Sequence, residues 1–140
     1  MKKYLTMMLL GLAFVSCKKE STPTAALNEH VDPLVATAKT SGGFSNGPYG
    51  SVTGTAKIYL TEDKYQLALE NFSTSNGPDL KVYLSKEMDP LSFVNLGSLK
   101  SISGNQLYDV PASVNTADYK YALIFCQQYK HLFGYSELKN

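Results

Sequence analysis

Two side chains near the C-terminal end of the chain, those of Cys126 and His131, are best suited to redox or ligand chemistry. A cysteine becomes a nucleophile or a ligand where a nearby cation, helix N-terminus or metal favours its thiolate. Lys130 and His131 follow Cys126 within five residues and could supply that charge. The alternative is a small apolar core residue, because free cysteine is among the most buried residue types. We predict Cys126 as a candidate redox thiol and keep the packing interpretation open.

The spacing of these residues also tests for a blue-copper centre, which needs two histidines, one cysteine and usually an axial methionine. The other histidine, His30, lies far upstream, and no methionine follows His131. In an unbroken strand, an odd offset would also place Cys126 and His131 on opposite faces. A blue-copper centre is therefore disfavoured. Covalently attached haem is excluded because the chain has no CxxCH motif.

The N-terminal segment has the pattern of an export signal. Lys2 and Lys3 precede a short apolar run that ends at Cys17, which is too short to span a bilayer and typical of a signal peptide over residues 1–16. A small residue followed by cysteine resembles a bacterial lipoprotein box. This predicts a lipidated Cys17 that anchors the protein to a membrane. The alternative is an ordinary secretory signal that is cleaved elsewhere.

Residues 18–20, Lys-Lys-Glu, resemble the surface-export signals of Bacteroidetes lipoproteins. We therefore expect an exported protein of the bacterial cell envelope, held at the outer membrane on its periplasmic or surface face. With Cys17 carrying lipid, Cys126 would be the only remaining thiol, so the mature chain could form no internal disulfide.

The composition argues against several classes of protein. The 140 residues carry a formal net charge of +1, and all 13 basic residues are lysines. This gives no electrostatic footprint for nucleic acid. The acidic residues form no paired-carboxylate pattern, and with two histidines and no nucleophile elbow a hydrolase triad is poorly supported. We expect an electron-transfer or binding module rather than a stand-alone enzyme.

The distribution of apolar residues divides the chain into three parts. After the signal, residues 17–48 have the composition of a flexible tether. Residues 49–140 show short alternating strands separated by turn signals, which predict an all-β domain, an antiparallel β-sandwich or partly open barrel of about seven to nine short strands. The expected strands are 52–60, 65–72, 79–85, 97–102, 106–111, 119–126 and 132–138.

The order of motifs across residues 50–139 resembles the electron-transfer DM13 (DM-thirteen) domain. Its most specific parts here are the strand Gly77-Pro78-Asp79-Leu80-Lys81-Val82-Tyr83-Leu84-Ser85 and the cysteine at the end of Ala122-Leu123-Ile124-Phe125-Cys126. The resemblance implies a β-sandwich proposed to work in redox chemistry through its cysteine, either as a free thiol or by holding a prosthetic group such as haem. By motif, that position is Cys126, with His131 a second candidate haem ligand.

Two functions follow as hypotheses. In the first, the domain is a redox accessory module that exchanges electrons with a partner protein through Cys126. In the second, Cys126 only packs, and a surface rich in tyrosine binds a partner protein or glycan at the cell envelope, since tyrosine is enriched at interfaces. Replacing Cys126 with serine would abolish activity or cofactor binding under the first hypothesis and cost only some stability under the second.

Overall fold

The computed structural model describes residues 21–140, which form one sheet of nine strands and a single 3-10 turn, η1 (Thr116–Asp118). The strands are β1 (Leu27–Asn28), β2 (Ala36–Asn46), β3 (Val52–Thr61), β4 (Lys64–Thr74), β5 (Leu80–Ser85), β6 (Phe93–Ser98), β7 (Ser103–Asp109), β8 (Tyr121–Cys126) and β9 (His131–Glu137). In this part of the chain, no helix is long and apolar enough to cross a membrane. The signal peptide and Cys17 lie outside the described residues.

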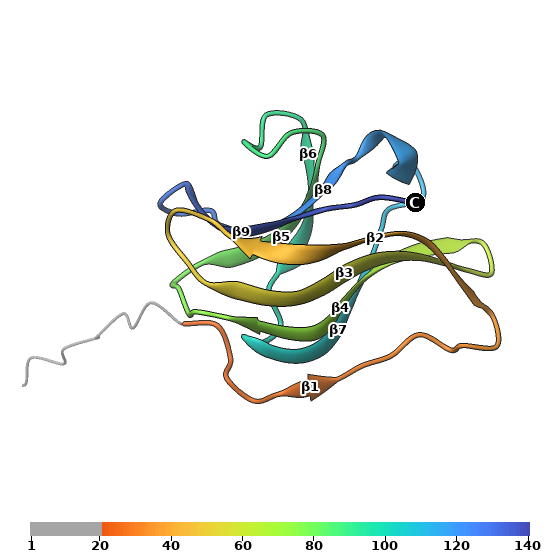
Figure 1. Cartoon of the computed structure of the whole chain (residues 1–140), viewed down its shortest axis with the longest axis horizontal. Coiled ribbons are helices and arrows are strands. Elements are labelled where there is room, and N and C mark those ends of the chain that lie inside the picture. The colour runs from red at the N-terminus through yellow and green to blue at the C-terminus, as the bar shows by residue number, and fades with distance from the viewer. Residues whose placement is uncertain (1–20) are drawn as a thin grey trace, which may run out of the picture.

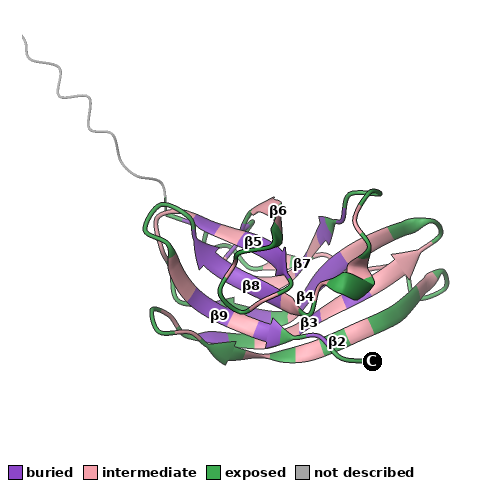
Figure 2. Ribbon diagram, turned by 90° about the horizontal axis from the view of Figure 1, so that it is seen from above, coloured by how far each residue is buried: buried purple, intermediate pink, exposed green. Residues whose placement is uncertain are grey.

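The sheet has the order β1-β7-β4-β3-β2-β9-β8-β5-β6 and is antiparallel except for the short pairing of β1 with β7 (Figure 1). Seen from above, it curves into an open trough, a half-barrel with its buried residues gathered along the inside (Figure 2). The all-β prediction is confirmed. Of the two expected architectures, the partly open barrel describes this curled sheet.

One strand, β2, joins the two halves of the trough. Its residues 36–43 pair with β3, and its residues 44–46 pair with β9. This differs from the expectation of a flexible tether over 17–48, which is wrong for residues 36–46. Small and polar residues suit a linker, but they can also form a strand when two neighbouring strands satisfy its backbone groups.

The core fills the inside of the trough. Alternate residues of β3, namely Val52, Ala56 and Ile58, are buried there, as the period-two pattern predicts. Strand β8 has apolar residues on both faces, is buried on both, and lies inside the sheet between β9 and β5. Its inward side chains join the main core, whereas Leu123 and Phe125 pack outside the trough with Tyr83 of β5.

The predicted strand at 97–102 is displaced toward the N-terminus, because β6 ends at Ser98. The ring of Phe93 stacks on Tyr83 with centroids 4.4 Å apart and fixes the start of β6. Beyond it, Ser101 and Gln106 hold the following turn through hydrogen bonds, including Gln106 Nε2 to the carbonyl oxygen of Ser101 at 2.7 Å. This turn leads into β7.

Candidate functional site at the loop end

Three loops meet at one end of the half-barrel, here called the loop end: residues 47–51, 75–79 and 127–130. Hydrogen bonds join them. Ser51 N donates to Ser75 Oγ at 3.0 Å, and Gln127 N donates to the carbonyl oxygen of Asp79 at 3.0 Å. The described chain also begins here, on the left in Figure 1, opposite the C-terminus. This end therefore brings together segments that are far apart in the sequence.

Cys126 is the last residue of β8 and lies just beneath the loop end. Its side chain is 1% exposed and belongs to the main core. In the register of the sheet, Cys126 is flanked by Leu80 of β5 and by His131 of β9. It is the free cysteine of the described residues. The Gly-Pro-Asp motif and the strand-end cysteine, both singled out in the sequence, are therefore neighbours in space.

His131 faces Cys126 across the β8–β9 hairpin. The expectation that an odd offset separates their side chains holds only for an unbroken strand. Here residues 127–130 reverse the chain, with Lys130 in the left-handed region at φ 55°, so the two residues are directly paired. Side chains of directly opposed residues project from the same side of an antiparallel sheet.

The His131 ring lies flat against Tyr49, with centroids 3.6 Å apart and planes 2° apart. The ring centroids of Tyr129 and His131 are 6.0 Å apart, so His131 belongs to a cluster of three rings. Sequence reasoning missed Tyr49, which it placed at the first residue of the domain. The only local signal was its place between Pro48 and Gly50, a turn composition that does not reveal the distant partner.

On the other flank of Cys126, the start of β5 carries charge. Asp79 Oδ1 lies 3.2 Å from Lys81 Nζ. The pKa of Tyr83 is raised above its ordinary value, first by burial and then by the negative charges that Asp79 and Cys126 can carry. The Tyr83 phenol therefore stays neutral over the physiological pH range. Asp79, part of the Gly-Pro-Asp motif, is thus an ion-pair partner of Lys81.

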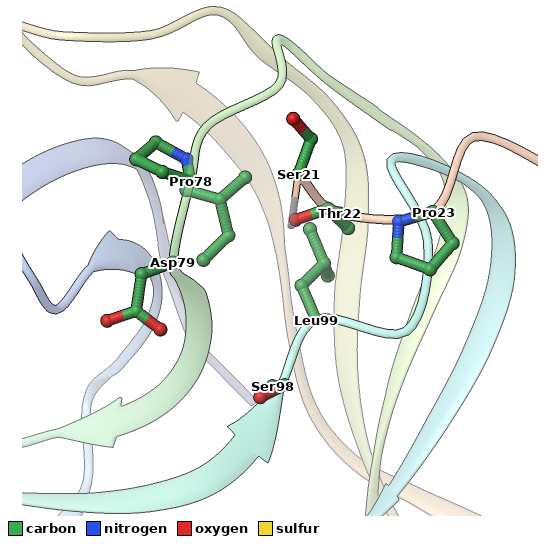
Figure 3. A pocket seen from close by; sticks show the side chains of 8 residues that line it. Ser21, Thr22, Pro23, Pro78, Asp79, Ser98 and Leu99 are labelled. Atoms are coloured by element: carbon green, nitrogen blue, oxygen red, sulfur yellow. The ribbon is translucent and has the colours of Figure 1, made fainter. Parts of the chain in front are cut away.

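A small cavity opens beside this flank, between the start of the described chain and the loop before β5 (Figure 3). It holds about 180 Å3 and is lined by residues that include Ser21, Pro78, Asp79 and Leu99. Figure 3 shows Pro78 and Asp79 on one side and Ser21, Thr22 and Leu99 on the other. The lining includes the polar side chains of Ser21, Thr22, Asp79 and Ser98, and the volume suits a few waters more than an organic cofactor.

The haem hypothesis requires space beside Cys126 or His131. Neither residue lines any of the five best-formed cavities found among residues 21–140. Cys126 is closely packed, and one face of the His131 ring is covered by Tyr49. The residues present do not fit haem in this arrangement. Within the described residues, no three His, Cys, Asp or Glu side chains are grouped closely enough to hold a metal. His30 is not near His131: it lies beside Asn28 of β1 and Asn105 of β7, at one edge of the sheet.

The sequence pattern of one protein family, described as electron transfer DM13, matches residues 44–138. The chain belongs to the electron-transfer DM13 family. The DM13 match runs from the end of β2 through β9 and so includes the loop end, Cys126 and His131. The resemblance drawn from the motifs is thereby confirmed. No curated protein and no solved structure matches the chain. The role proposed for DM13 domains is electron transfer.

Proposed function

We propose that the protein is a lipid-anchored cell-envelope protein whose DM13 domain takes part in electron transfer through Cys126. The observation that carries the proposal is the position of the thiol. Cys126 ends a central strand directly beneath the loop end and faces His131 across a hairpin. The family match and the lipoprotein-like N-terminus, with Cys17 as the lipidated residue, support the rest.

The burial of Cys126 determines which redox chemistry is open to it. In thiol–disulfide exchange, the Cys126 thiolate would attack one sulfur of a partner's disulfide. The S–S bond would break, the partner's other sulfur would leave as a thiolate, and a mixed disulfide would form. A side chain that is 1% exposed reaches such a partner only when the hairpin turn 127–130 opens locally. The proposal therefore predicts exchange that is gated by this opening.

The test is the rate at which glutathione disulfide forms a mixed disulfide with the purified protein, followed by mass. We expect slow exchange at Cys126 that is still faster than global unfolding, as measured by urea-jump kinetics under the same conditions. Exchange no faster than global unfolding would show that Cys126 is only a core residue, and the redox role would be rejected.

A matched control gives the rate of an unprotected thiol on the same turn. Gln128 is exposed, so Gln128→Cys in a Cys126→Ala background should react about as fast as a free peptide thiol. We expect this control to react at least tenfold faster than Cys126 in the unsubstituted chain. Equal rates would mean that Cys126 is not protected, contrary to the gating proposed here.

A second function, binding of a glycan or partner protein, is favoured by an aromatic surface outside the trough. Tyr83, Phe93 and Phe125 line a cavity of about 440 Å3 there, and Phe93 is 41% exposed. Asp89, Gln127 and Lys130 add polar groups at its edge. Aromatic faces with a polar rim are typical of binding surfaces. Oligosaccharide binding that is lost in Phe93→Ala and kept in Cys126→Ser would select this function.

A further inference from the structure

We infer that the loop end is the face the protein turns toward the membrane, so that residues 47–51 and 127–130 lie against lipid headgroups. The inference rests on the lipid anchor proposed above for Cys17. It adds an orientation and a contact surface that the anchor alone does not specify. Its evidence is the way the chain is fixed immediately after the proposed anchor and what the loop end presents to solvent.

The first described residues are bound to the loop end. Thr22 N donates to Asn76 Oδ1 at 3.1 Å, and Asn76 Nδ2 donates back to the Thr22 carbonyl oxygen at 3.0 Å. The next residue is fixed too, because Ile102 N donates to the carbonyl oxygen of Pro23 at 3.0 Å. Thr22 is 8% exposed. The segment 21–25 is therefore a fixed part of the half-barrel.

This attachment leaves a short connection to the membrane. Only residues 18–20 separate Cys17 from Ser21. The path from Cys17 to Ser21 has four residue-to-residue steps, which span at most about 14 Å when fully extended. Ser21 therefore cannot lie farther than that from an acylated Cys17. Because Ser21 is held against the loop before β5, the same limit brings the loop end to the headgroup region. A flexible tether of 17–48, as the sequence suggested, would have imposed no such limit.

The loop end presents side chains that suit this position. Tyr49 is 56% exposed and Tyr129 is 49% exposed, and both rings lie beside His131. Lys130 is exposed between Tyr129 and His131. Tyrosine is enriched where membrane meets water, and lysine is attracted to anionic headgroups. The surface is therefore compatible with lipid on both counts.

The opposite end of the half-barrel provides the reference point. There Glu62 and Asp63 form the exposed turn between β3 and β4, on the right of Figure 1. Strand β3 has ten residues, which places this turn roughly 33 Å from the loop end. Two labels, one at each end, should therefore differ clearly in their distance from a bilayer.

The experiment uses the full lipidated chain in vesicles that contain a lipid with a spin-labelled headgroup. Gln128→Cys and Asp63→Cys, each in an otherwise unsubstituted chain, are reacted with a fluorophore under native conditions, and the unsubstituted chain serves as the labelling blank because Cys126 is buried. Flotation of the vesicles measures anchoring, and quenching of the fluorophore measures proximity to the headgroups. A third chain carries ten Gly-Ser residues inserted after Glu20 in the Gln128→Cys variant.

We expect all chains to float, quenching at position 128 to exceed that at position 63 by severalfold, and the insertion to remove most of the excess. Chains that float with equal quenching at both positions, or with more at position 63, would overturn the orientation and leave the lipid anchor intact. Full quenching at position 128 despite the insertion would overturn the short connection as its cause. Chains that fail to float would overturn the anchor and this inference together.

Discussion

At the scale of single residues, the surroundings of Cys126 decide whether its thiol only packs in the core or can also react. The sequence of β8 is apolar on both faces, so it leaves open which face points into the trough. The packing around Cys126 could not be predicted either, because its neighbours come from distant segments: Leu80 of β5 pairs with it, and Phe133 of β9 belongs to the same core cluster. Only the fold reveals that this strand-end thiol is buried in the main core.

Serine at position 126 should destabilise the protein more than alanine. Alanine leaves a small cavity, with a cost of about 1–2 kcal/mol. Serine is also smaller than cysteine, and it buries a hydroxyl in an apolar cluster, where an unpaired hydroxyl costs about 1–3 kcal/mol in addition to the lost apolar contact. Urea unfolding of both variants measures the difference, with exposed Gln128→Ser as a control expected within about 0.5 kcal/mol of the unsubstituted protein. A serine variant as stable as the unsubstituted chain would place a polar partner or water at Cys126.

Tyr108 should make the stability fall at alkaline pH. Burial raises the pKa of its phenol well above the ordinary value, the nearby Glu29 charge adds to this, and the hydrogen bond from Lys100 N opposes it. A raised folded-state pKa contributes stability that is complete below the unfolded pKa of about 10 and is lost as the pH rises above it.

In Tyr108→Phe we expect a shallower loss of stability above pH 10. At neutral pH the variant should lose about 1–2 kcal/mol, because Gln106 Oε1 loses the donor that lies 2.7 Å away. Urea midpoints measured from pH 7 to pH 11 give both quantities. An unchanged alkaline slope would assign the loss to Tyr59 and Tyr83, whose pKa values are also raised, each first by burial.

At the scale of elements, the short strand β1 depends on a glycine opposite it. Gly104 has φ +96°, and a Cβ there would lie about 2 Å from the carbonyl oxygen of Leu27. Gly97 has φ +117° with nothing near its Cβ position. Both alanine variants carry backbone strain of about 1–3 kcal/mol, but only Gly104→Ala should also displace β1.

Hydrogen exchange separates these two effects. We expect fast exchange at Glu29, whose N–H donates to the Asn105 carbonyl oxygen at 3.0 Å, in Gly104→Ala and protection close to the unsubstituted level in Gly97→Ala. Equal protection in the two variants would show that β1 tolerates the clash. This pair is informative because the glycines share a conformation and differ only in what lies opposite.

Most strands could be predicted from sequence, and the reasons for the failures are local. β3, β4 and β8 carry clear alternation or apolar runs, so their existence and type were predictable. β2 was missed because Ala, Thr, Ser and Gly dominate it and only Phe44 packs on the core. The pairing of Tyr49 with His131 was not predictable, since no pattern within either segment refers to the other.

At the scale of the whole molecule, the two halves of the sheet depend on β2. The fragment 49–140, the domain expected from sequence, lacks that strand. Without it, β3 and β9 lose their shared neighbour, and the inner core is open along its length. We expect fragment 49–140 to lack a cooperative thermal transition by circular dichroism and fragment 21–140 to show one. A cooperative transition in the shorter fragment would mean that each half is stable by itself.

The same strand sets the order in which the protein can fold. β2 is made early, but its partner β9 is the last of the nine strands in chain order. The two halves therefore cannot be joined until β9 has been synthesised. Pairing of strands so far apart in sequence is intrinsically slow, because the loop between them must be closed first. Until β9 has been made, the two halves of a nascent chain stay separate, a state in which a polypeptide can still be threaded through a pore.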